Sequence, residues 1–150
     1  MQSFLMRTPK GFIPENDESA RAMQKVPVGG VISVNWSRPR NYEFHKRFFA
    51  LLNIGFDAWE PPESTYRGLP VQKNFERFRK DVIISAGYYE PVANIRGEVR
   101  AEAKSISFAK MSQEEFEKLY NAAANVLLQK VLTNYTRSDL DDVVEKLIRF

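Results

Sequence analysis

The chain has 150 residues, of which 43% are hydrophobic and 13% aromatic, and it contains no cysteine. This length and composition predict one domain with a packed core, and they exclude disulfides, thiolate metal ligands and a cysteine nucleophile. The first residues lack the apolar core of a signal peptide, and no apolar run reaches the roughly 18 residues that a membrane span needs. We therefore expect a soluble, cytoplasmic protein that contacts no membrane.

The net charge of +3 is distributed unevenly along the chain. Residues 1–110 hold 17 lysines and arginines against 12 acidic residues, whereas residues 111–150 hold 5 against 7. A chain with a basic body and an acidic C-terminal end is suited to binding a polyanion, because phosphate contacts supply most non-specific affinity for nucleic acids. An ordinary mixed surface is the alternative, since an excess of 17 − 12 = 5 charges is not extreme.

The first 36 residues predict short elements. Residues 2–8 alternate loosely and predict an edge strand, which a turn at 9–11 and a short extension follow. Residues 16–24 are acidic early and basic late, which suits a short helix. Residues 31–36 are β-branched and aromatic and predict a strand.

Two helices are predicted in the middle of the chain. Over residues 41–59, large apolar side chains recur on one arc of a helical wheel and so predict a buried face. The members of this arc are Phe44, Phe48, Leu51, Leu52, Phe56 and Trp59. Residues 62–70 predict a loop, and residues 73–86 predict the second helix.

The last third predicts a hairpin and two more helices. Residues 88–108 alternate with period two, which favours two strands with one wet face. Ser112 and Glu115 form a capping-box pattern for a helix to about Val131, and Ser138 is expected to cap the last helix. The fold class expected for residues 1–150 is a single α+β domain, with a small antiparallel β-sheet packed with about four to five α-helices.

Residues with catalytic chemistry are few. His45 is the single histidine, and the wheel places it inside the apolar arc, where a structural role is more common than a catalytic one. No second histidine exists, and no carboxylates stand at ligand spacing beside it, so we expect no metal and no cofactor. Two acidic clusters leave a metal-dependent nuclease as a third hypothesis, although acids are also favoured in first helical turns. These clusters are Glu114, Glu115 and Glu117, and Asp139, Asp141 and Asp142. We therefore favour a protein that is not an enzyme.

Cations and aromatic side chains are grouped in a way that favours binding. The first group combines flat rings with positive charge, as sites for single-stranded nucleic acid do. It consists of Trp36, Arg38, Arg40, Tyr42, Lys46 and Arg47. A second group on the following helix contains Lys73, Arg77, Arg79 and Lys80, and a third on the hairpin contains Arg96, Arg100 and Lys104. These groups either merge into one groove or are dispersed solubilising charge, and the sequence supports both interpretations.

Residues 41–61 read Asn-Tyr-Glu-Phe-His-Lys-Arg-Phe-Phe-Ala-Leu-Leu-Asn-Ile-Gly-Phe-Asp-Ala-Trp-Glu-Pro. This segment resembles the phage and prophage family known as domain of unknown function 1367, whose members have Asn-Pro-x-Phe-His-Arg-Arg-Phe-Phe-Ala-Leu-Leu-Asn-Leu-Gly-Phe-x-x-Trp at this place. Further matches lie at residues 74–89, which end in Ala-Gly-Tyr-Tyr, and at residues 104–120. The family is typically longer after the Trp-Glu-Pro motif, where this chain has only residues 62–72 before the next helix.

The resemblance implies a bacteriophage or prophage origin and an association with replication and recombination genes. Our first hypothesis is a DNA-binding accessory protein of these processes that binds single-stranded or branched DNA. Arg38, Arg40, Lys46 and Arg47 would hold phosphates, and Trp36 or Tyr42 would stack on a base. The alternative is a phage-encoded protein that binds and inhibits a host defence complex directed at nucleic acid. A homo-oligomer is compatible with both.

Overall fold

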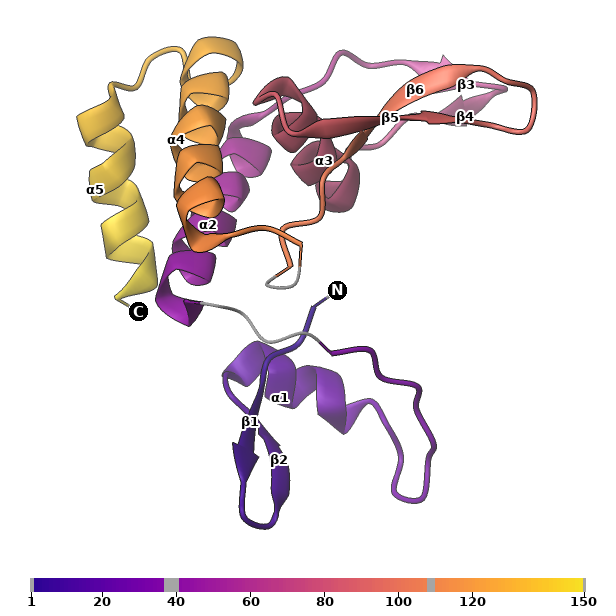
Figure 1. Ribbon diagram of the computed structural model, residues 1–150, viewed down its shortest axis with the longest axis vertical. Helices are drawn as coiled ribbons and strands as arrows, with labels where there is room; N and C mark the ends of the chain where they lie inside the picture. Colours follow the sequence, from indigo (N-terminus) through magenta and orange to yellow (C-terminus); the bar gives the residue numbers. More distant parts are fainter. Residues whose placement is uncertain (1, 37–40, 108–109, 150) are drawn as a thin grey trace. The chain divides into compact units, whose positions relative to one another are not determined.

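The computed structural model describes residues 2–36, 41–107 and 110–149 (Figure 1). The chain divides into two compact units, Met1–Trp36 and Ser37–Phe150, here called the N-terminal unit and the helical unit. The described residues form five helices and three two-stranded antiparallel sheets. This arrangement confirms the predicted α+β class, and the strands occur as three separate pairs. In the described parts of the chain, no helix is both long and apolar enough to span a bilayer.

The N-terminal unit begins with a hairpin. Strand β1 (Leu5–Thr8) pairs antiparallel with β2 (Gly11–Pro14), so the predicted edge strand is confirmed and the predicted extension is its partner. Gly11 has a φ of 129°, a conformation that glycine adopts without steric cost and that closes the turn.

Helix α1 (Asp17–Gln24) follows the hairpin and confirms the predicted short helix. Asn16 caps it, because its side-chain oxygen accepts a hydrogen bond from the Ser19 amide at 2.9 Å. The Ser19 hydroxyl oxygen in turn accepts from the Phe4 amide at 2.8 Å. This buried serine therefore connects the helix to the start of the hairpin.

Residues 31–36 do not form the strand that the sequence predicts. They are exposed, and no backbone hydrogen bond involves them in the part of the chain that the structure describes. The physical reason is that a β-prone segment becomes a strand only where it pairs with another strand, and within the described residues β1 and β2 pair with each other and not with residues 31–36.

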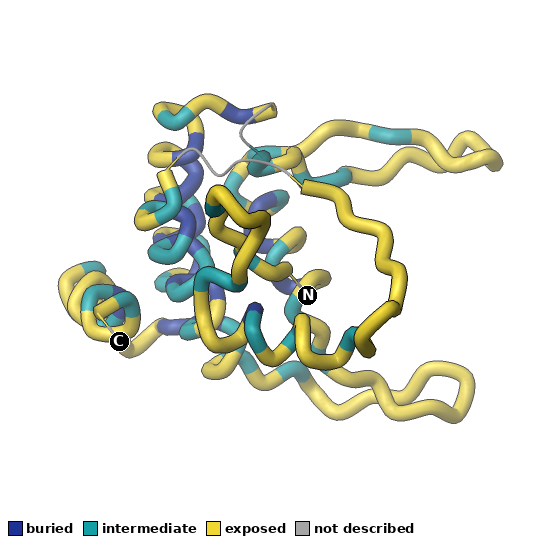
Figure 2. Tube along the Cα trace, turned by 90° about the horizontal axis from the view of Figure 1, so that it is seen from below, coloured by how far each residue is buried: buried dark blue, intermediate teal, exposed yellow. Residues whose placement is uncertain are grey.

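The helical unit contains the hydrophobic core of the described residues. Its helices are α2 (Tyr42–Ala58), α3 (Phe75–Ser85), α4 (Gln113–Lys130) and α5 (Arg137–Ile148), close to the predicted ranges. Helix α2 packs on α5, and α3 packs on α4. The largest fully enclosed side chains of this unit come from all four helices: Phe48, Leu51, Leu52, Ile83, Leu119, Leu127, Leu140 and Val144. Figure 2 shows the buried positions in dark blue, mainly along these helices.

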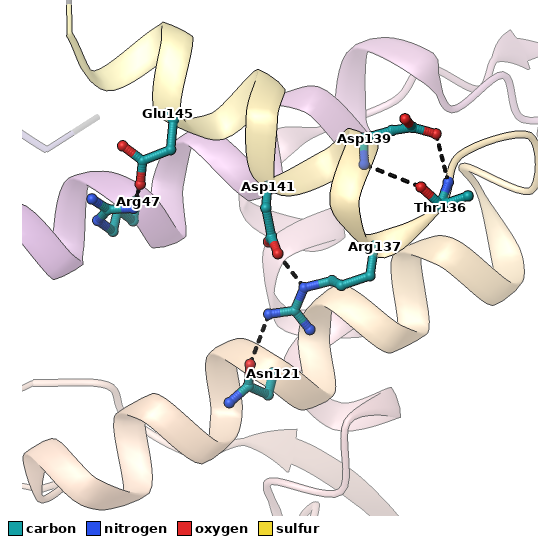
Figure 3. A network of polar contacts seen from close by, with 7 residues as sticks. All are labelled: Arg47, Asn121, Thr136, Arg137, Asp139, Asp141 and Glu145. Carbon is teal, nitrogen blue, oxygen red and sulfur yellow. Dashed lines mark hydrogen bonds and ion pairs between the residues drawn. The ribbon is translucent and has the colours of Figure 1, made fainter.

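Helix starts in this unit are fixed by side-chain caps. Ser112 and Glu115 form the predicted capping box of α4. The predicted cap of α5 at Ser138 is wrong, because Thr136 caps this helix two residues earlier. Thr136 and Asp139 exchange two bonds of 3.0 and 3.1 Å, which satisfies both backbone amides at once (Figure 3).

Two hairpins complete the helical unit. Strands β3 (Thr65–Tyr66) and β4 (Leu69–Pro70) form a minimal pair inside the predicted loop. Strands β5 (Tyr89–Ala93) and β6 (Val99–Ala103) confirm the longer hairpin, which projects beyond the helices in Figure 1. The prediction that only one face of this hairpin is wet is wrong, since Val99 on its apolar side is 71% exposed. The hairpin extends beyond the helices (Figure 1), so they do not cover that side along its whole length.

Candidate functional site

The first turns of α2 carry one ring and one cation of the predicted nucleic-acid site. The Lys46 ammonium lies 4.5 Å from the centre of the Tyr42 ring and 3.7 Å from the Glu43 carboxylate. The structure thus brings Tyr42 and Lys46 together as predicted. The charge of Lys46 nevertheless already faces an acid and a ring of its own helix.

Arg47 is directed toward α5. Its guanidinium forms an ion pair with the Glu145 carboxylate, 98 residues away in the sequence (Figure 3). Each side chain of the pair is 36% exposed. The predicted phosphate ligand therefore has its charge balanced by an acid of the same unit.

Lys73 has a structural contact at the opposite end of α2. Its ammonium donates to the carbonyl oxygens of Phe56 at 2.9 Å and Trp59 at 3.1 Å, and it lies 4.7 Å from the centre of the Phe56 ring. Cations are favoured at helix C-termini because the last carbonyls have no partners within the helix. The Lys73 side chain therefore caps the C-terminal end of α2.

The remaining cations of α3 differ in their partners. Arg77 pairs with Asp81 at 3.2 Å, one turn further along the helix. Lys80 is exposed, and within the described ranges no ion pair involves it. Of the three predicted nucleic-acid ligands in this stretch, Lys80 is thus the one without an ion pair among the described residues.

Trp36 belongs to the N-terminal unit, whereas Arg38 and Arg40 lie outside the described residues. The indole is 77% exposed, and its centre lies 5.4 Å from that of the Phe12 ring. Arg7 is the cross-strand partner of Phe12 in the hairpin and is also exposed. The N-terminal unit therefore has its own exposed ring pair beside a cation.

His45 is buried, with 8% of its surface exposed, and its ring centre lies 4.6 Å from that of Phe49. Burial, together with the nearby Arg79 charge, lowers the pKa of His45 below its ordinary value of 6.5. The imidazole is consequently neutral at pH 7. This placement agrees with the predicted structural role.

A groove of about 460 Å³ lies between α2, α4 and α5. One cation, three carboxylates, one amide and two aromatic rings line it. These residues are Phe44, Arg47, Glu117, Tyr120, Asn121, Asp141 and Glu145. Sequence reasoning did not identify this groove, apart from Arg47. The spacings of four residues between Glu117 and Asn121 and between Asp141 and Glu145 place each pair on one helix face, but they do not reveal that these faces meet.

The groove contains an internal example of guanidinium binding. Arg137 Nε donates to Asp141 Oδ1 at 2.9 Å, and its Nη2 donates to Asn121 Oδ1 at 2.7 Å (Figure 3). The same guanidinium lies 5.8 Å from the centre of the Tyr120 ring. Burial, and secondarily the Asp141 charge, raises the pKa of Tyr120, so its hydroxyl stays protonated. The lining therefore holds a planar cation by a carboxylate, an amide and an aromatic face.

The two acidic clusters considered for metal-dependent cleavage have other contacts. Glu115 and Asp139 close capping boxes, and Glu114 pairs with Lys118 at 3.1 Å. Over residues 2–36, 41–107 and 110–149, no group of three or more histidines and acids is arranged to hold a metal ion.

Comparison with known proteins places the chain in a family. The sequence model described as protein of unknown function (DUF1367) matches residues 2–69 and 64–150. Because these matches span nearly the whole chain, the protein belongs to this family, as its resemblance indicates. The two matches overlap at residues 64–69, within the connection between α2 and α3. No curated protein and no solved structure matches the chain. The phage origin and the recombination setting stay predictions.

Proposed function

We propose that this protein is a non-enzymatic binding protein whose groove between α2, α4 and α5 takes a basic segment of another protein. The observation that carries the proposal is the set of groove residues that already binds the guanidinium of Arg137. The phage-encoded inhibitor predicted as an alternative would be one protein of this kind.

Charge supports a cationic occupant. With Arg137, whose guanidinium the lining binds, two arginines stand against three carboxylates, a balance of 2 − 3 = −1. A phosphate backbone would meet repulsion there, whereas an arginine or lysine of a partner would be attracted. The acidic C-terminal end of the chain therefore contributes a surface that disfavours a polyanion.

The chemistry of the lining supports arginine over other cations. Carboxylate and amide oxygens accept from the fork of a guanidinium, and an aromatic ring stacks on its plane. Glu117 is exposed at the edge of the groove, and its carboxylate accepts a 3.2 Å hydrogen bond from the Gln113 side chain. It is the carboxylate of the lining that has no cationic partner among the described residues.

The test is a calorimetric titration of the full chain with a hexa-arginine peptide, with hexa-glutamate as the opposite charge. We expect the arginine peptide to bind and the glutamate peptide not to bind. Glu117→Gln should weaken arginine binding about two- to fivefold, as expected for one exposed ion pair. The matched control is Glu114→Gln, which removes an equal charge from the same helix outside the groove.

Equal affinities of the two variants would mean that the peptide binds elsewhere by general attraction. Absence of arginine-peptide binding at low salt would contradict the proposal outright.

A second candidate function is binding of single-stranded nucleic acid on the N-terminal unit. The exposed pair of Trp36 and Phe12, with Arg7 opposite Phe12, supports it. Flat rings beside cations suit unstacked bases and their phosphates. Of the predicted nucleic-acid ligands, this site retains Trp36. It uses Phe12 and Arg7 of the hairpin β1–β2 in place of Lys46 and Arg47, whose charges are paired within the helical unit.

Fluorescence anisotropy with labelled single-stranded, duplex and branched DNA across a salt series tests this candidate. Trp36→Ala should weaken binding about five- to a hundredfold, since stacking is worth about 1–3 kcal/mol per base. Tyr66→Ala is the control, because Tyr66 is a similarly exposed aromatic residue of the helical unit. Equal losses in both variants, or no binding at low salt, would exclude this site.

A further inference from the structure

The N-terminal unit has no hydrophobic core of its own. Within described residues 2–36 no hydrophobic side chain is buried, and Ser19 is the one buried residue. The exposed large hydrophobic residues of this unit are Leu5, Met6, Phe12, Ile13, Met23, Val28, Val31, Ile32, Val34 and Trp36. Met6 and Ile13 are cross-strand partners, and the Phe12 ring lies beside that of Trp36, so some of these side chains are neighbours. Exposed neighbouring apolar side chains are typical of sites of association.

The same unit has unused backbone hydrogen-bonding groups. Strands β1 and β2 pair with each other, so in the described chain each keeps one open edge. Residues 31–36 form neither helix nor strand, and within the described residues no backbone hydrogen bond involves them. An open sheet edge is a template on which an extended segment adds as a further strand.

We propose that residues 31–36 of one copy of this protein add as a third strand to the hairpin β1–β2 of a second copy, and that the second copy does the same in return. The composition of the segment suits this role, since valine, isoleucine and tryptophan favour strands. In strand conformation Ile32, Val34 and Trp36 share one face, so their side chains would lie on the same face of the enlarged sheet.

A second copy is favoured over another occupant because both complementary parts lie in one unit. Each copy offers an open hairpin and an unpaired strand-forming segment, so two copies satisfy each other twice around a two-fold axis. Addition to the hairpin also gives three strands, whereas two copies of residues 31–36 alone would form a two-stranded ribbon, which is marginally stable in water.

Sedimentation velocity of the full chain over a wide concentration range tests the proposal. We expect a concentration-dependent change from 17.4 kDa to twice this mass. The double variant Ile32→Lys, Val34→Lys should weaken dimerisation by at least about a hundredfold, because two apolar contacts are lost.

Two further variants sharpen the test. Val28→Lys with Ile95→Lys makes the same exchanges at fully exposed positions outside the segment, and it should leave the dimer intact. The double variant Ser33→Pro, Val34→Pro removes two successive amide donors, one of which faces the partner strand in either register, and it should also weaken the dimer.

A wild-type chain that stays at 17.4 kDa at every concentration would overturn the proposal, and its apolar segment would then be covered within the chain or by another protein. A dimer that tolerates the double lysine variant as well as its control would overturn it too. A dimer lost with the double lysine variant but unchanged in the double proline variant would show apolar docking without strand addition, and would contradict the β-pairing.

Discussion

The two units of this protein differ in how their apolar side chains are used. In the described residues, every buried hydrophobic side chain belongs to the helical unit, although the N-terminal unit is also rich in large hydrophobic residues. The hydrophobic character of a side chain alone therefore does not decide whether it is buried. What decides it is whether the chain itself supplies a second element to cover each apolar face.

The helical unit supplies such elements because its helices are long enough to present whole apolar faces to one another. Gly55 shows how closely they pack, since an added Cβ would lie 2.6 Å from Leu127 Cδ2. The N-terminal unit has only short strands and one helix of eight residues. A unit of this size rarely buries enough surface to be stable alone, which is why we assign it a partner.

The largest expected difference between the units comes from matched phenylalanine substitutions. Phe48→Ala removes a fully buried ring and should lower the free energy of unfolding by about 3–5 kcal/mol. Phe12→Ala removes a ring that is 48% exposed and should change it by less than about 0.5 kcal/mol at concentrations where the chain is monomeric. Urea denaturation followed by circular dichroism measures both. Similar losses would show that the N-terminal unit has a core of its own.

A smaller effect is expected at the helix caps, which stabilise the helical unit locally. Ser112→Ala removes the side chain that accepts from the Glu115 amide and should cost about 0.5–2 kcal/mol. Ser138→Ala is the matched control, because Thr136 rather than Ser138 caps α5. It should leave the melting temperature nearly unchanged. A larger loss at Ser138 than at Ser112 would contradict the observed helix starts.

The smallest effect concerns the pH dependence of the helical unit. The folded protein lowers the pKa of His45 below 6.5, so the unfolded chain takes up a proton at higher pH than the folded one. This contribution to stability is present above the unfolded pKa and is lost as the pH falls through the folded pKa. Thermal melts from about pH 8 to about pH 5 should therefore show a decline that His45→Gln reduces. Parallel curves for both proteins would exclude this contribution.

Local patterns in the sequence were sufficient for much of the helical unit. The apolar arc of α2 and the Ser112 capping box depend on neighbouring residues and were predicted close to their observed positions. The α5 cap was misplaced because Thr136 and Ser138 both precede an acidic turn, and the geometry of the reciprocal bonds decides between them.

The candidate site was less predictable because it depends on tertiary contacts. Arg47 was taken as a phosphate ligand, since its partner Glu145 lies far along the sequence. Lys73 was assigned the same role, although its ammonium closes α2. Residues 31–36 have the composition of a strand, but whether they form one depends on an edge outside the segment.

Hydrogen exchange of the full chain at two concentrations, one below and one above dimerisation, is the most direct measurement of this difference between the units. We expect the amides of α2 and α4 to be protected at both concentrations, because their contacts lie within one chain. Alternate amides of residues 31–36, those that face the partner strand, should be protected only at the higher concentration. Protection of these amides that is equal at both concentrations, or absent at both, would contradict strand exchange between two copies.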